Sequence, residues 1–83
     1  HDHLYERFAP QDPDGRPDPA RGIRQFIVGT GGAALYPSGA PRPNSEMRIS
    51  AFGVLRLTLA SDGYDWEFVG VPGPRDSGAG TCH

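Results

Sequence analysis

The sequence contains no lysine, so its positive charge is carried by eight arginines, set against ten acidic residues. These arginines are scattered from Arg7 to Arg75 and form no basic stripe that could follow a phosphate backbone. The formal net charge is only −2, so charge repulsion does not favour a disordered chain either. The charge pattern therefore excludes the simplest class of nucleic-acid-binding protein.

Cysteine and long apolar runs are equally scarce. The one cysteine, Cys82, cannot form a disulfide within the chain. It is either an unpaired thiol or, if the protein is secreted, a partner for a cysteine outside these residues. No apolar run approaches the ~20 residues that a membrane-spanning helix needs, so we expect no membrane span.

The residues that build hydrophobic cores are also few. Ile, Leu, Val and Phe total sixteen of 83 residues, just under the roughly 20% below which a composition resembles that of disordered chains. Twelve glycines and nine prolines make up about a quarter of the chain. The chain also begins at His1 rather than at a methionine. We therefore expect one small, loop-rich segment of a larger protein, whose core is completed by residues outside it.

No segment shows a helical period, and the apolar residues instead mark strands and loops. Four prolines between Ala9 and Arg21 predict a surface loop. The apolar run Ile23–Val28 predicts a strand buried on both faces. The stretch Leu35–Ser50 carries three prolines and is expected to be irregular.

The clearest structural signal is a β-hairpin. Leucines alternate with polar residues over residues 55–59, and aromatic residues alternate with acidic ones over residues 64–68, on either side of Asp62-Gly63. This pattern predicts two strands whose leucines and aromatic rings face inward.

The length of the hairpin connection sets the pairing of its strands. A two-residue turn would place Leu57 opposite Phe68, whereas a four-residue connection over residues 60–63 would place Leu57 opposite Trp66. Both alternatives keep the inward faces matched, because a shift of two residues preserves side-chain parity. We expect the second strand to end near Val71, because proline follows it.

A glycine-rich segment, residues 29–34, fits the G-x-G-x-x-G/A pattern of dinucleotide-binding proteins. That chemistry needs a helix to begin at the last glycines, so that the helix N-terminus faces the pyrophosphate. Pro37 arrives three residues later and forbids such a helix. The glycines are therefore interpreted as a tight turn after the strand.

The pair His1 and His3 is the strongest chemical signal. In extended backbone, residues i and i+2 point to the same side of the chain, about 6–7 Å apart. Two imidazoles so placed can share one metal ion or bind two neighbouring ions. A His-x-His pair alone also arises by chance, so its meaning depends on the residues around it.

Residues 1–7, His-Asp-His-Leu-Tyr-Glu-Arg, supply that context. They resemble the last motif of calcineurin-like metallophosphoesterases, especially the purple acid phosphatase branch, which reads Gly-His-x-His-x-Tyr-Glu-Arg. Residues 29–32, 53–59 and 64–68 resemble the closing strands of a bacterial member of that family. The resemblance thereby covers most of the chain.

This resemblance implies an α/β (α+β) fold, a sandwich of two mixed sheets flanked by helices. Residues 1–72 would be the last, mostly β segment of the catalytic domain, and residues 73–83 a flexible glycine-rich tail. The branch is largely extracytoplasmic, which implies a secreted protein with Cys82 oxidised.

The resemblance also implies a binuclear metal site and phosphatase activity. His1 would bind the divalent ion and His3 its partner, giving Fe with Zn, Mn or Fe as the cofactors. The two ions activate water for attack on a phosphate ester. The family's other ligand motifs are absent here, so the remainder of the catalytic domain would supply them and the isolated chain would be inactive.

Tyr5, Glu6 and Arg7 have two interpretations. They could be residues that orient the ligand imidazoles through hydrogen bonds. They could equally be an ordinary Glu–Arg surface pair beside a core tyrosine. His83, next to Cys82, is assigned no specific role.

Two other functions compete with the phosphatase hypothesis. If His1 is a mature N-terminus, its α-amine, the following amides and His3 could bind Cu(II) in square-planar geometry. Alternatively, the chain is a non-catalytic β module appended to an enzyme. In that case His1 and His3 would be dispensable for the activity of the enzyme.

Overall fold

The computed structural model describes residues 1–37 and 39–83, and this part of the chain contains six β-strands and no helix. The strands form two antiparallel sheets of three strands each. The expected α/β sandwich with flanking helices is therefore wrong, because the described residues are all-β. Glycine and proline interrupt the chain too often, and no apolar period of 3.6 residues is present for a helix to bury. Within the described residues there is no helix that could cross a membrane.

The first sheet has the order β2-β1-β3, with β1 at Tyr5–Phe8, β2 at Phe26–Val28 and β3 at Ser45–Ile49. Both neighbours run antiparallel to β1. Central β1 is the most buried of the three strands. The segment that begins with the candidate ligands thus continues directly into the middle of a sheet.

Strand β2 is shorter and more exposed than the apolar run Ile23–Val28 suggested. It begins only at Phe26 and lies at the edge of its sheet. Ile23 is 78% exposed and Val28 is 37% exposed. The prediction of a strand buried on both faces is therefore wrong. An edge strand has a neighbouring strand on one side only and stays partly exposed.

Strand β3 lies within the stretch that was expected to be irregular, residues 35–50, of which residue 38 is outside the described residues. Its pairing with β1 shifts register between Arg7 and Phe8. This β-bulge leaves Glu46 without a paired residue on β1, and bulges commonly redirect a side chain. The Glu46 carboxylate accepts hydrogen bonds from Arg7 and Arg24, both at 2.5 Å.

The second sheet has the order β4-β5-β6, with β4 at Phe52–Leu59, β5 at Gly63–Val71 and β6 at Arg75–Thr81. Strands β4 and β5 form the predicted hairpin. Leu57 lies opposite Trp66, which is the register of the four-residue connection. The predicted end of the second strand at Val71 is also confirmed.

Strand β6 corrects the expectation of a flexible tail over residues 73–83. Gly78 of β6 lies opposite Trp66 of β5, and a Cβ added at Gly78 would lie 2.3 Å from the Trp66 ring. Gly80 has the same relation to Tyr64, whose hydroxyl would be 2.5 Å from an added Cβ. The glycines thus make room for the aromatic rings of the neighbouring strand, and these rings hold the glycine-rich strand in place.

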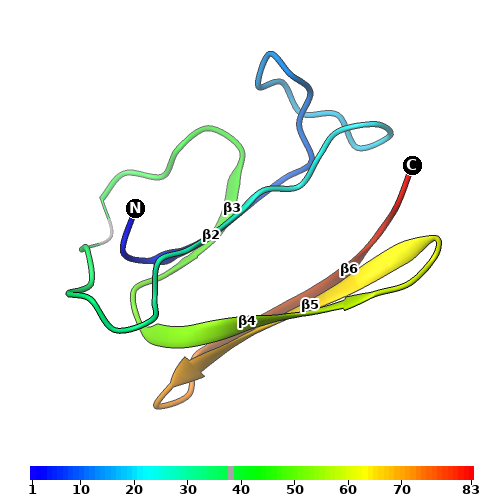
Figure 1. The fold of residues 1–83 in the computed structure, drawn as a ribbon. Helices are drawn as coiled ribbons and strands as arrows, with labels where there is room; N and C mark the ends of the chain where they lie inside the picture. Colours follow the sequence, from blue (N-terminus) through cyan, green and yellow to red (C-terminus); the bar gives the residue numbers. More distant parts are fainter. Residues whose placement is uncertain (38) are drawn as a thin grey trace.

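The two sheets lie one above the other (Figure 1). Aromatic side chains are buried between them. Tyr5 of β1 stacks on Phe68 of β5, with 4.3 Å between ring centroids. Phe26 of β2 meets Trp66 edge to face at 5.4 Å. Trp66 and Phe68 are 5% and 0% exposed, so the predicted inward face of the second hairpin strand is confirmed.

Candidate metal-ligand site

His3 lies in a tight turn immediately before β1. The Leu4 amide donates to the Asp2 carbonyl at 2.9 Å, a bond between residues i and i+2 that makes His3 the central residue of a three-residue turn. The backbone at His3 is therefore not extended. The spacing argument made for an extended chain does not describe this segment, and the metal role of His1 and His3 stays a prediction.

The imidazole of His3 is held by a loop that follows β2. Its Nδ1 lies 2.8 Å from the carbonyl oxygen of Ala34. A carbonyl oxygen can only accept, so Nδ1 carries the hydrogen of this bond. In the neutral ring Nε2 is then the unprotonated nitrogen, which is the form that binds a metal ion.

Tyr36 completes the support of His3. The two rings lie with centroids 4.6 Å apart, and the Tyr36 amide donates to the His3 carbonyl at 2.8 Å. The Tyr36 carbonyl in turn accepts from the Ser50 hydroxyl at 2.8 Å. Ring and backbone of His3 are thus fixed from the same loop, which limits the rotamers of the side chain.

His1 is less constrained than His3. His1 is exposed, and the Asp2 carboxylate forms an ion pair with Arg42. That ion pair ties the segment before β1 to the loop before β3. Both histidines thus project from a segment whose backbone is anchored at Asp2, His3 and Leu4.

The described residues contain no group of three or more His, Cys, Asp or Glu side chains that could together hold a metal ion. His1 and His3 are only two side chains of a type that binds metal ions, so a complete site would need further donors. Cys82 is exposed, and His83 Nε2 lies 3.0 Å from the Gly22 carbonyl, on another part of the molecule from the Ala34 loop.

No protein-family model, curated protein or solved structure matches this chain. The resemblance to metallophosphoesterases therefore rests on the sequence motifs alone.

The side chains of Tyr5 and Arg7 do not contact His1 or His3 but point between the sheets, toward Asp76 of β6. The Tyr5 hydroxyl donates to Asp76 Oδ2 at 2.6 Å. Arg7 donates from Nε to Asp76 Oδ2 at 2.7 Å and from Nη2 to Asp76 Oδ1 at 3.2 Å. The interpretation of Tyr5 as a core tyrosine agrees with its complete burial.

The charges in this cluster shift one another's protonation. Burial opposes ionisation of Asp76, but hydrogen bonds from Arg7 and Tyr5 outweigh it and hold the pKa of this carboxyl below its usual value. Burial, and then the neighbouring Asp76, raise the pKa of the Tyr5 hydroxyl well above its usual range. The hydrogen bond to Asp76 raises the pKa of Arg7. The cluster therefore links the two sheets through an ion pair between Arg7 and Asp76.

Glu6 points to the opposite side of β1 from Tyr5 and Arg7, as alternation along a strand requires. It is only 2% exposed, and its Oε2 lies 4.0 Å from Arg48 Nε, too far for a hydrogen bond. Glu6 thus faces an arginine of β3 rather than either histidine.

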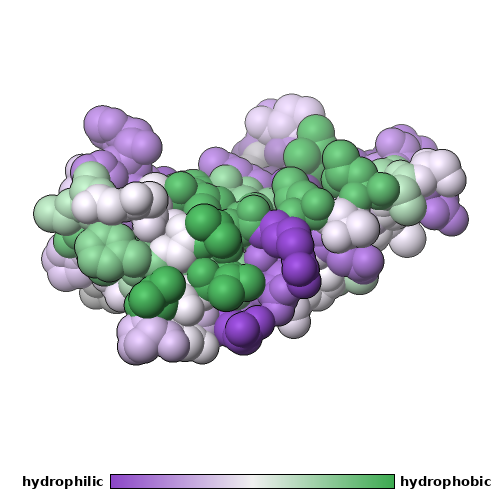
Figure 2. Space-filling view, turned by 60° about the horizontal axis from the view of Figure 1, so that its bottom comes forward, coloured by the Kyte–Doolittle hydropathy of each residue, from purple (hydrophilic) through white to green (hydrophobic). Residues whose placement is uncertain are grey.

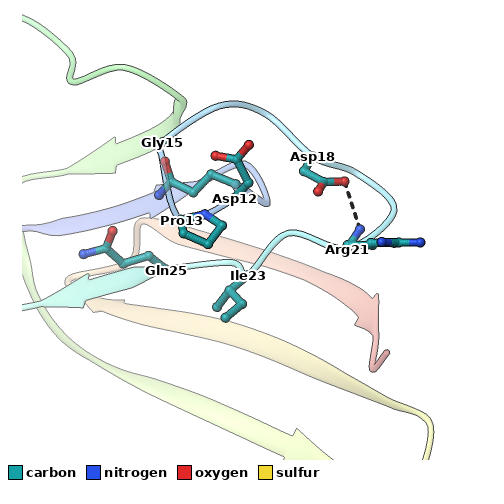
Figure 3. A pocket seen from close by; sticks show the side chains of 8 residues that line it. Asp12, Pro13, Gly15, Asp18, Arg21, Ile23 and Gln25 are labelled. Carbon is teal, nitrogen blue, oxygen red and sulfur yellow. Dashed lines mark hydrogen bonds between the residues drawn. The ribbon is translucent and has the colours of Figure 1, made fainter.

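A pocket of about 840 Å³ opens in the proline-rich loop, between Gln11 and Gln25 (Figure 3). Its two carboxylates already stabilise the loop. Asp12 Oδ1 accepts from the amides of Asp14 and Arg16, and Asp18 Oδ1 accepts from the Arg21 amide at 3.0 Å. No residue before Gln11 lines this pocket, so it is separate from the candidate metal ligands.

Sequence reasoning missed the two residues that position His3. Ala34 is 31 residues away along the chain and acts through its backbone carbonyl, which no side-chain pattern can reveal. Tyr36 lies in a stretch rich in proline and glycine, where an aromatic residue carries no periodic signal. Asp76 was missed for another reason, because its segment was interpreted as a tail.

Proposed function

We propose that this chain supplies His1 and His3 as metal ligands to a binuclear metal-dependent hydrolase of phosphate esters. The observation that carries the proposal is the hydrogen bond from His3 Nδ1 to the Ala34 carbonyl, which leaves Nε2 free. Ligand histidines in proteins almost always donate their second ring N–H to a carbonyl or carboxylate in this way. The partner would be the remainder of the catalytic domain, and the substrate a phosphate ester.

The role of the chain in such an enzyme is to position ligands. When bound, a pair of ions such as Fe with Zn, Mn or Fe polarises the phosphate ester and lowers the pKa of water. His3 would present Nε2 in one orientation, because Ala34 and Tyr36 hold its ring. His1 would add a second, exposed imidazole from the same segment. The described residues offer no third donor beside these two, so the other ligands must come from elsewhere.

The test measures metal content and turnover together. The full-length natural protein that contains this sequence would be compared with its His1→Ala and His3→Ala variants. Elemental analysis would measure the metal content, and hydrolysis of an aryl phosphate would measure turnover. Each variant should lose a different ion. Turnover should fall at least about 100-fold, since loss of even an outer-shell partner commonly costs 10–100-fold. His83→Ala is the matched control and should keep both metal and activity.

The 83-residue chain by itself gives a second readout. It should bind metal weakly and show no turnover, while long-range ¹H–¹⁵N spectra should show His3 with its proton on Nδ1. Unchanged metal content and full activity in both histidine variants would refute the proposal.

A second function, a non-catalytic β module that packs against an enzyme, is favoured by a different observation. Several large apolar side chains of the second sheet are exposed, among them Val54, Leu57, Leu59 and Val71. This function predicts that both histidine variants retain metal and turnover, so the same experiment separates the two candidates.

A further inference from the structure

Strand β4 forms one edge of the second sheet and leaves part of its backbone unpaired. At Gly53 the outward-facing groups are occupied, because the Gly53 amide donates to the Thr30 carbonyl at 3.1 Å and the Gly53 carbonyl accepts from the Thr30 hydroxyl at 2.8 Å. The amide of Gly53 thus points away from β5. The register of β4 with β5 is continuous, so Leu55, Leu57 and Leu59 direct their amides and carbonyls outward as well.

These three leucines meet no backbone partner among the described residues. The free edge therefore runs from Leu55 to Leu59. It ends before Gly53, whose backbone bonds to Thr30.

This edge lacks the features that usually prevent strands from pairing between molecules. Natural edges are protected by proline, lysine, bulges or inward-pointing charges. Strand β4 has eight residues, no proline and no lysine, and its one charge, Arg56, lies on the outer face. Arg56 is held there by Glu67 of β5, with 2.5 Å between Nη2 and Oε1.

Apolar side chains flank the free edge. On the face toward the first sheet, Leu57 is 49% and Leu59 is 77% exposed. On the outer face Val54 is 64% exposed. In Figure 2, which turns the underside of Figure 1 toward the reader, hydrophobic surface extends on both sides of a hydrophilic area. A strand added beside β4 would pair the backbone and cover these side chains in one step.

We propose that the occupant of this edge is a second copy of the chain, with the two β4 strands paired antiparallel about a two-fold axis at Leu57. This register places Leu57 opposite the partner's Leu57 and Leu55 opposite the partner's Leu59. It uses all three residues with free backbone groups. A register centred on Leu55 would need the outward amide and carbonyl of Gly53, which already bond to Thr30. A register centred on Leu59 would extend into the hairpin turn.

The charges also fit this register. Arg56 falls opposite the partner's Thr58, so the axis brings no arginine directly opposite another. The leucines on the inner face meet leucines, which is the pairing of like apolar side chains that stabilises antiparallel strands. The pattern of β4 is thus self-complementary, as a two-fold interface requires.

The proposal predicts a dimer that depends on concentration, since an edge of this length buries less surface than a standard interface. Sedimentation equilibrium of the 83-residue chain would measure its dissociation constant. The key variant is Thr58→Lys. In the monomer the new lysine lies opposite Asp65 of β5, which preserves the fold. In the dimer it lies opposite the partner's Arg56 and repels it.

The matched control is Ser77→Lys, which adds the same charge opposite Glu67, on the far edge strand of the sheet. We expect Thr58→Lys to raise the dissociation constant at least tenfold and Ser77→Lys to change it less than twofold. Hydrogen exchange should show the amides of Leu55, Leu57 and Leu59 becoming protected as protein concentration rises. A chain that stays monomeric at millimolar concentration would overturn the proposal, as would equal effects of both variants or unprotected leucine amides in the dimer.

Discussion

Trp66 contacts side chains from several parts of the molecule. The guanidinium carbons of Arg7 and Arg24 lie 5.4 and 4.7 Å from its ring centroid, and Phe26 packs against it edge to face. Such cation–ring contacts are worth more when they are withdrawn from water. Trp66 therefore joins residues of the first sheet and of the loop before β2 to the centre of the second sheet.

Replacing Trp66 by alanine should lower the free energy of unfolding by roughly 3–5 kcal/mol, the cost of deleting a large buried aromatic ring. Urea denaturation followed by far-ultraviolet circular dichroism would measure the change. Glu67→Ala serves as the control on the adjacent residue. It removes ion pairs to the exposed Arg56 and Arg75, and exposed pairs contribute at most about 1 kcal/mol each. Equal losses in the two variants would mean that Trp66 does not carry the core.

At the scale of elements, the packing of β6 requires a residue without a side chain where Gly78 lies against the Trp66 ring. Gly78→Ala should destabilise the protein by about 1–3 kcal/mol, because its Cβ would lie 2.3 Å from the Trp66 ring and the ring must move. Gly73→Ala, in the turn before β6, is the control, since its Cβ would meet nothing within 4 Å. Thermal unfolding would show the difference. A Gly78→Ala variant as stable as Gly73→Ala would mean that β6 does not pack under Trp66.

The hairpin was predictable from sequence because its information is local. Alternation fixes which side chains share a face, and that parity holds for either connection length. Strand β6 was not predictable, since its glycines gain their meaning only from the rings of Tyr64 and Trp66 across the sheet. Strand β3 was missed for a similar reason. It pairs with β1, about 40 residues earlier in the chain, and prolines just before it suggested a loop.

For the whole molecule, the strands derived from residue patterns agreed with the structure better than the fold class derived from a family resemblance. The resemblance implied helices, and the described residues contain none. For the candidate site, the sequence indicated His1 and His3 as donors but not how they are held. The Ala34 carbonyl reaches His3 only through the path of the chain after β2, and such long-range backbone contacts leave no trace in a single sequence.

The two sheets are tied together by Asp76, which accepts hydrogen bonds from Tyr5 and Arg7 of the other sheet. This tie should give the stability of the whole molecule a characteristic pH dependence. The pKa of Asp76 is lower in the folded protein than its usual value. Its contribution is therefore present above about pH 4, the ordinary pKa of aspartate, and is lost as the pH falls through the folded value. The pKa of Tyr5 is raised, so its contribution is present below about pH 10 and is lost as the pH rises further.

Asp76→Asn isolates the acidic part of this dependence, because asparagine does not titrate and other groups contribute equally to both proteins. The difference in unfolding free energy between the natural chain and Asp76→Asn should be constant from about pH 5 to 8. It should shrink between about pH 4 and 2, as protonation removes from the natural chain the charge that the variant already lacks. Urea unfolding at each pH measures both curves. A difference for Asp76→Asn that did not change below pH 4 would show that Asp76 is not ionised against Arg7 in the folded state.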